Sequence, residues 1–498
     1  MRITNRMMTN NMLSNINKNK LNVSKLEEQY STGKKIQKPS DDPIVTVRAL
    51  KLRTNLTELE QYFDKNIPDA MSWMDITEGS LSTINDILRQ INTDCVQGAS
   101  DSLTATVRAS IVQNLIEMKN QIYQEGNANY AGRYVFSGYK TDSSLTFMDN
   151  VDHLQYDITE NFSGDQIEMV SRVSGSYELN DFDDPLVDFG DAPRTENTYR
   201  LKLSYDKLEN MTIDSIRYTK PVTGGESEEQ LPFVDIKTIS AYDPDAYNPQ
   251  PPSGINFIYE TGEIIMHGSI YEELRMADNI ELSYTKVNFE KGELKPEHYF
   301  NCVMTDHNKP EQPQIHYTKE KQEIQYEINY NQKLTINTEG SDAISHKIGR
   351  DIDDILKAVD DVIQVEGKIA EVEKRLEDKN LTDDQVLRYE KMLEQFGTEL
   401  DLKKEVMQTT FARGITSSNK EQDRVNVAAA DLGSRLFRLR LTENRLSSQK
   451  VDFKELMSKN EDVDIVDTII NFNAAQMIYN SSLSAASRVV QNSLLDFL

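Results

Sequence analysis

Both ends of this chain, more than 400 residues apart, carry apolar side chains at the spacing of helical seven-residue repeats. Such a stripe lines one face of a helix and predicts a partner helix. Because neither end can bury its stripe inside its own helix, we expect both to lack a partner within the chain and to be poorly ordered in an isolated subunit. The stripes predict a polymer subunit whose assembly interface contains Met12, Ile16, Val23, Leu26, Tyr30, Ile469, Phe472, Tyr479, Leu483 and Val490.

The composition narrows the classes of partner. A formal charge of -27 at pH 7 disfavours nucleic acid, because phosphate binding needs clustered Lys and Arg. No apolar run approaches the roughly 20 residues of a membrane span, and the amino-terminal segment lacks the apolar centre of a cleaved signal peptide. We therefore expect neither a membrane span nor ordinary secretion. Cys95 and Cys302 fall in segments that we assign to different domains, so no disulfide is expected.

The apolar periodicity changes twice along the chain and predicts an α+β fold. Helical spacing follows Asp42, a suitable cap, and Pro43, which fits the first helical position; this helix should end near Phe63. Further helical stripes follow Pro68 and end near residue 125. Alternation with a period of two, typical of antiparallel strands, begins near residue 141. We expect a long coiled-coil-like helical bundle made from both chain ends, with an inserted antiparallel β domain.

The second helical block should contain a helical hairpin near 365–415. Asn380 splits it, and Thr382 with Gln385 forms a capping box that starts its second helix. A separate helix is expected over about 419–452. The expected domains are a terminal helix over 1–40, the first half of the helical domain over 41–140, one or two β-rich outer domains over 141–340, the second helical half over 341–455 and a second terminal helix over 456–498.

Three groups of residues could form chemical sites, but a structural role explains each group better. Ser31-Thr32-Gly33-Lys34-Lys35 has a superficial likeness to a phosphate-binding loop, but Glu28 stands where the first glycine is needed. His298, Cys302 and His307 match no zinc-ligand spacing. Asp41 and Asp42 are better explained as helix capping than as a catalytic pair. We therefore expect no enzymatic activity, metal or cofactor.

Several short segments together form a specific pattern. They are Met1-Arg2-Ile3-Thr4, Tyr30-Ser31-Thr32-Gly33-Lys34-Lys35-Ile36, Pro39-Ser40-Asp41-Asp42-Pro43, Asn129-Tyr130-Ala131-Gly132-Arg133-Tyr134-Val135-Phe136-Ser137-Gly138, Asn460-Glu461-Asp462-Val463-Asp464 and Ser493-Leu494-Leu495-Asp496-Phe497-Leu498. These segments resemble the flagellar hook-associated protein 3 family, the flagellin-like subunits at the junction of hook and filament in bacteria. The resemblance covers about 140 residues at the front and about 70 at the back, and it implies that the hairpin near 365–415 is an addition to the family's pattern.

The resemblance implies a structural subunit of the bacterial flagellum that joins hook to filament. Its terminal helices would pair in an inner coiled-coil layer, with the β domain facing outward. The implied partners are copies of the chain in a ring, the adjacent hook-associated junction protein, flagellin and an export chaperone that shields the carboxy-terminal helix. The implied location is extracellular, after export unfolded through the flagellar type III pathway without a cleaved signal peptide.

Three alternatives remain open. Flagellin itself shares the terminal design. An adhesin or carbohydrate-binding protein could carry the β insertion on a helical stalk. A metal-dependent hydrolase using His298 and His307 is the third.

Overall fold

The computed structural model describes residues 5–100, 103–183, 187–209, 213, 215–221, 227–251, 254–309, 311, 313–377 and 381–495, with the backbone alone at 5, 105, 183 and 489–495. This part does not include the expected split at Asn380, the side chain of Val490, residues 1–4 of the first quoted motif or residues 496–498 of the last. The chain forms two compact units. Unit 1 contains Met1–Ala70, Tyr326–Leu334 and Phe437–Leu498; unit 2 contains Met71–Gln325 and Thr335–Leu436.

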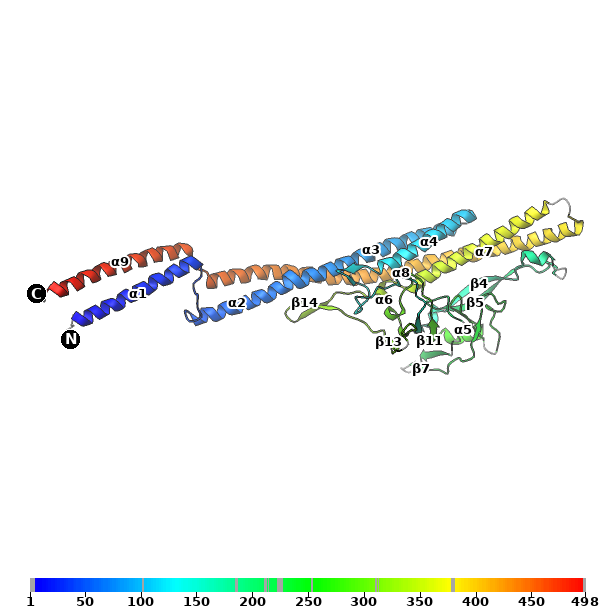
Figure 1. Cartoon of the computed structure of the whole chain (residues 1–498). Coiled ribbons are helices and arrows are strands. Elements are labelled where there is room, and N and C mark those ends of the chain that lie inside the picture. The colour runs from blue at the N-terminus through cyan, green and yellow to red at the C-terminus, as the bar shows by residue number, and fades with distance from the viewer. Residues whose placement is uncertain are drawn as a thin grey trace. The chain divides into compact units, whose positions relative to one another are not determined.

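Long helices occupy both halves of the chain (Figure 1). They are α1 Asn5–Thr32, α2 Pro43–Gln61, α3 Ile67–Gly98, α4 Ala105–Glu125, α7 His346–Leu376, α8 Asp383–Glu461 and α9 Ile465–Leu495, with the short helices α5 Gly268–Leu274 and α6 Gly340–Ala343. Packing of the two helical blocks is confirmed within unit 2, where Asn85 Nδ2 donates to Asn426 Oδ1 at 2.8 Å and Lys119 Nζ lies 2.9 Å from Asp353 Oδ1.

The helix that begins at Pro43 does not end near Phe63 as expected. Asp42 caps it by accepting from the backbone N–H groups of Ile44 and Val45. α2 then passes directly into a π-helical turn, Tyr62–Asn66, and on into α3. A proline ring inside an α-helix clashes with the carbonyl four residues earlier, and the wider π turn lies just before Pro68. The helix therefore continues through the proline.

α8 also corrects an expectation, because the helices expected from Thr382 and over 419–452 are one helix of 79 residues. The Thr382–Gln385 cap is confirmed, with Gln385 N–H donating to Thr382 Oγ1 at 3.3 Å. The sequence of α8 contains no proline, and an α-helix tolerates its glycines at a modest cost in stability. Nothing local therefore ends the helix.

The β insertion is a sandwich of two sheets in unit 2. The strands are β3 Leu154–Phe162, β4 Glu168–Ser174, β5 Arg194–Lys202, β6 Ile216–Pro221, β7 Ser227–Glu229, β8 Lys237–Ile239, β9 Ile255–Ile258, β10 Glu263–Met266, β11 Asn279–Lys286, β12 Asn301–Asp306 and β13 Ile315–Tyr317. Short pairs also form between β1 Asn129–Tyr130 and β2 Arg133–Tyr134, and between β14 Gln325–Asn329 and β15 Gln332–Thr335.

The sheet orders are β4-β5-β10-β9-β8 and β13-β12-β3-β11-β6-β7. Pairing within them is antiparallel except between β8 and β9, which run parallel. One apolar core contains side chains from both sheets, such as Leu282 of β11 and Phe257 of β9. The expected antiparallel β insertion is thus confirmed, with one parallel pair at an edge.

The hairpin expected near 365–415, made by α7 and the first part of α8, contacts the connection between β4 and β5. Phe182 of that connection stacks on Tyr389 with ring centroids 3.8 Å apart. Phe189, 2% exposed, belongs to the same core as Val372 and Phe396 of the hairpin. The hairpin therefore packs against the long connection between β4 and β5.

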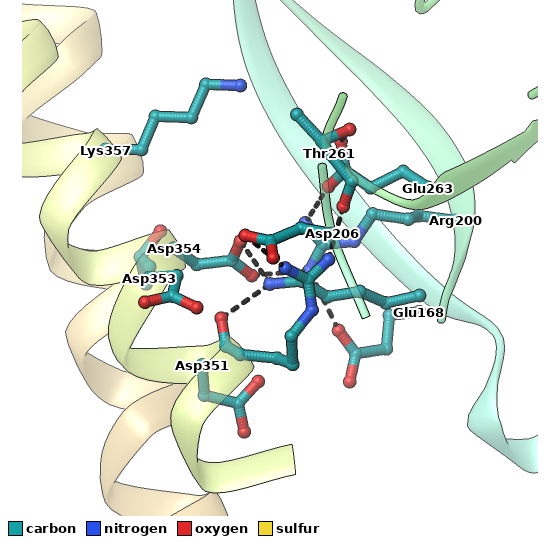
Figure 2. Close-up of polar contacts among 12 residues, drawn as sticks. Glu168, Arg200, Asp206, Thr261, Glu263, Asp351, Asp353, Asp354 and Lys357 are labelled. Atoms are coloured by element: carbon teal, nitrogen blue, oxygen red, sulfur yellow. Dashed lines mark hydrogen bonds and ion pairs between the residues drawn. The ribbon is translucent and has the colours of Figure 1, made fainter. Parts of the chain in front are cut away.

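A buried ion cluster fixes the sandwich to α7 (Figure 2). Arg200 of β5, whose side chain is 6% exposed, donates to Glu263 Oε1 at 2.6 Å, Asp354 Oδ2 at 2.7 Å and Glu168 Oε2 at 3.2 Å. Lys202 Nζ lies 2.5 Å from the other oxygen of Asp354. A buried charge is tolerated when it is paired and hydrogen-bonded, so each member of this Arg200 cluster needs the others.

The pKa values of the cluster follow from this pairing. Burial alone would raise the pKa of Glu263, but Arg200, Lys202 and Lys357 together outweigh it and lower that pKa to about 2. Burial opposes ionisation of Asp354 in the same way, and Lys202 with Arg200 lowers the pKa of Asp354 below its ordinary value. Both carboxylates therefore stay charged at neutral pH.

Replacing Arg200 should destabilise unit 2. We expect Arg200→Met to lower the free energy of unfolding at pH 7 by roughly 3–5 kcal/mol, because the buried carboxylates of Glu263 and Asp354 lose a charged, hydrogen-bonded partner. A group with a lowered folded pKa stabilises above its unfolded pKa, so the difference from the unmodified chain should shrink as pH falls from about 4.5 to 2. Urea unfolding across this range measures it. Arg194→Met, at an exposed position of the same strand, is the control; equal losses would contradict the prediction.

Candidate assembly interface

The two terminal helices pair with each other within one chain. α1 and α9 lie side by side in unit 1 (Figure 1) and make extensive contact. The expectation that the terminal stripes lack partners within the chain is therefore wrong, because each helix supplies the apolar stripe that the other needs.

The structure places the predicted interface residues in three environments. Ile16 is buried, and Met12, Val23, Leu26, Ile469, Phe472 and Tyr479 are half-buried. Tyr30 is exposed by 49% but stacks on Phe472 with centroids 6.4 Å apart. Leu483 is exposed by 43%.

A polar pair in this contact stripe was missed by the sequence reasoning. Asn19 Nδ2 donates to Ser482 Oγ at 2.9 Å. Asn19 lies three residues after Ile16 and four before Val23, so it continues the heptad, and Ser482 does the same after Tyr479. A polar residue at such a position fixes the register of a coiled coil at some cost in stability. The heptad spacing would have identified this pair if polar residues had been considered as well as apolar ones.

A second contact fixes the base of the terminal pair. Glu461, the last residue of α8, accepts two hydrogen bonds from Arg53 of α2, at 2.8 and 2.5 Å. Lys34, just after α1, reaches Asp462 at 2.5 Å and Glu461 at 3.5 Å. We call these four residues the terminal ion cluster. The Glu461 side chain is 3% exposed, so its charge depends on these partners.

Backbone hydrogen bonds join the same segments. Lys35 N–H donates to Glu461 O at 2.7 Å, and Val463 N–H donates to Gly33 O at 3.0 Å. Gly33 has a φ of +70°, a conformation that favours glycine. Asp464 then caps α9 by accepting from the N–H groups of Val466 and Asp467. The motifs near residues 30–36 and 460–464 therefore meet at one place, which explains the Gly33-Lys34-Lys35 segment without a bound phosphate.

The electrostatics of the terminal ion cluster keep its members charged. The hydrogen bond from Arg53 lowers the pKa of Glu461, and the hydrogen bond with Lys34 lowers the pKa of Asp462. The same hydrogen bond to Asp462 raises the pKa of Lys34. The cluster should therefore persist at neutral pH.

A second set of large apolar side chains on the terminal helices is exposed. They occur on both α1 and α9, each is more than 40% exposed, and we call them the outward apolar surface. They are Met7, Met8, Leu13, Leu21, Ile465, Val466, Ile470, Met477, Ile478 and Leu483.

The candidate metal ligands belong to the sandwich and have other roles. His298 is buried with Nε2 3.3 Å from Ser144 O, and burial lowers its pKa to about 4. Cys302 is buried in β12, which raises the pKa of its thiol to about 12. His307 is exposed beside Gln155. Within the described residues, no three His, Cys, Asp or Glu side chains gather as a metal ion would require.

No helix in the described ranges is both long enough and apolar enough to cross a membrane.

Comparison with known proteins identifies both helical ends. Residues 3–141 match the bacterial flagellin N-terminal helical region, and residues 416–498 match the bacterial flagellin C-terminal helical region. Flagellar hook-associated protein 3 of Salmonella typhimurium is 31% identical over 145 residues, which are 29% of this chain and 45% of the relative. A flagellin of Clostridium tyrobutyricum is 32% identical over 127 residues, 26% of this chain and 33% of the relative.

These matches are partial. The chain spans less than half the length of the curated relatives that it matches. Among solved structures, flagellar hook-associated protein 3 of Legionella pneumophila aligns over 82% of this chain and 97% of its own at 11% identity, but a TM-score of 0.30 is too low to support an argument. The resemblance that the terminal motifs indicated is confirmed: the two ends of the chain match the N-terminal and C-terminal helical regions of the bacterial flagellins, and the chain is similar to flagellar hook-associated protein 3.

Proposed function

We propose that the chain is a structural subunit of the bacterial flagellum that joins hook to filament and assembles through its paired terminal helices. Its partners would be copies of itself in a ring, the adjacent hook-associated junction protein, flagellin and an export chaperone. It would act outside the cell after flagellar export, without catalysing a reaction. The relatives named flagellar hook-associated protein 3 support this proposal.

The observation that carries the proposal is the uneven distribution of exposed apolar side chains. In the described part of the chain, 19 large ones lie in unit 1 and 12 in unit 2, although unit 1 has 141 residues and unit 2 has 357. Apolar surface at this density marks a site of interaction with another protein. Unit 1 is thus the better candidate for contact between subunits.

The distribution of charge supports the same division. Unit 1 has 20 Lys and Arg residues against 17 Asp and Glu, whereas unit 2 has 35 against 65. Copies of unit 1 can approach each other with little repulsion, and copies of unit 2 repel at close range. Unit 1 would form the packed layer, and unit 2 would remain in solvent.

Flagellin is the second candidate, because a flagellin matches 127 residues at 32% identity. Electron microscopy of the purified chain, alone and added to hooks that bear the preceding junction protein, distinguishes the two when flagellin is supplied last. A short collar that flagellin requires for growth supports the junction role. Long filaments of the chain alone would instead make it a flagellin.

A charge on the outward apolar surface should block assembly without unfolding the subunit. We expect Leu483→Glu to abolish attachment of filaments, because burying an unpaired carboxylate costs several kcal/mol. Phe472→Glu should have the same effect but also disrupt the α1–α9 pair. Leu483→Met keeps the surface apolar and is the control. Filament counts by microscopy, with circular dichroism for folding, test this; normal filaments on Leu483→Glu would count against the assignment.

Loss of the terminal ion cluster should loosen the base of the terminal pair. Arg53→Met removes two hydrogen bonds to Glu461 and should weaken this contact by roughly 1–3 kcal/mol, reduced by the exposure of Arg53 to water. Hydrogen exchange at the Lys35 and Val463 amides should then become faster. Arg48→Met, at an exposed site of α2, should leave these amides unchanged. Unchanged exchange in Arg53→Met would show that the backbone bonds suffice.

A further inference from the structure

Two glycines in the long helices of the bundle have no packing reason to be there. Gly79 lies inside α3 and Gly433 inside α8, and a Cβ built at either would meet nothing within 4 Å. Glycine inside a helix costs about 1 kcal/mol relative to alanine, because the unfolded backbone has more freedom to lose. Each helix is therefore locally weakened without a steric demand.

Other glycines in the same helices are explained by close contacts. A Cβ at Gly98 would lie 2.4 Å from the Phe411 ring, and one at Gly414 would lie 2.8 Å from Ile355 Cδ1. A side chain at these positions would displace the core. Gly79 and Gly433 differ from them in having open space.

The two open glycines lie at the same level of the bundle. α3 and α8 run antiparallel, since Asn85 bonds Asn426 while Asn92, further along α3, bonds Ser418, which is earlier in α8. Moving six residues back from Asn85 reaches Gly79. Moving about as far forward from Asn426 reaches Gly433. The two glycines therefore lie at about the same level along the antiparallel α3–α8 pair.

A groove beside α8 leaves room for movement at this level. Its volume is about 550 Å³, and Arg424, Val427, Asp431 and Arg435 of α8 line one side of it. The segment after β15 lines the other side. Arg435 crosses between the two sides, donating to Asn337 O at 2.7 Å and to Thr338 Oγ1 at 3.2 Å. On the groove side α8 is held by these polar contacts, while Leu432 and Leu436 of the same turns are buried.

We propose that Gly79 and Gly433 form a bending point of the α3–α8 pair. Thermal bending concentrates where two neighbouring helices are weakened at the same level and one side is unpacked. The Arg435 hydrogen bonds limit the amplitude toward the groove. This property is independent of the proposed function, because it belongs to the isolated chain.

The test replaces both glycines and measures the flexibility of α8. Gly79→Ala with Gly433→Ala should slow amide exchange in residues 75–83 and 429–437 about five-fold, the factor that corresponds to ~1 kcal/mol of helix propensity. Spin labels on Asp423→Cys and Asn444→Cys, exposed positions on either side of Gly433, should give a narrower distance distribution. The labels are selective because Cys95 and Cys302 are buried.

The matched control replaces Gly367 of α7 and Gly397 of α8. A Cβ at either of these glycines would also meet nothing within 4 Å, but both lie in the hairpin of α7 and the first part of α8. Their replacement by alanine should leave the label distances and the exchange of residues 75–83 and 429–437 unchanged. Unchanged exchange and an unchanged distance distribution in the Gly79/Gly433 variant would overturn the proposal. So would weaker self-association with unchanged exchange, because the glycines would then serve close contact between copies.

Discussion

The pairing of α1 with α9 is the interaction on which unit 1 depends. It joins helices separated by more than 400 residues, so closing this loop costs considerable chain entropy before any contact is made. The intervening bundle lowers that cost, because α2 and α8 already bring Arg53 to Glu461 at the base of the terminal pair. The terminal helices can then pair progressively, starting at the hydrogen bond from Val463 N–H to Gly33 O and continuing toward both chain ends.

The predictions from sequence succeeded where one local signal decided the outcome. Asp42 caps α2, Thr382 and Gln385 cap α8, and the alternation at Leu282 places that side chain in the sandwich core. They failed where the outcome depended on distant segments. The partner of the amino-terminal stripe is at the other end of the chain, and nothing in either stripe states whether its partner is the same molecule.

The Arg200 cluster was invisible for a related reason. Its members come from β4, β5, β10 and α7, and no local spacing unites Glu168, Arg200, Glu263 and Asp354. Sequence shows that charges are abundant, but it does not show which few are buried together. Such a cluster favours one orientation of the sandwich on α7, because each charge must meet its partner. An apolar contact of similar area would tolerate more orientations.

The π-helical turn before Pro68 affects how the sequence of the α2–α3 segment is aligned with the sequences of relatives. Leu59, Phe63 and Ile67 follow one another at steps of four residues, and in an α-helix each such step moves a side chain about 40° around the axis. A π turn closes its hydrogen bond one residue later and so absorbs an extra residue. Leu59 and Ile67 both remain buried on either side of it. An alignment with a relative that has an uninterrupted α-helix here therefore needs a one-residue gap between Tyr62 and Asn66, inside a helix and not in a loop.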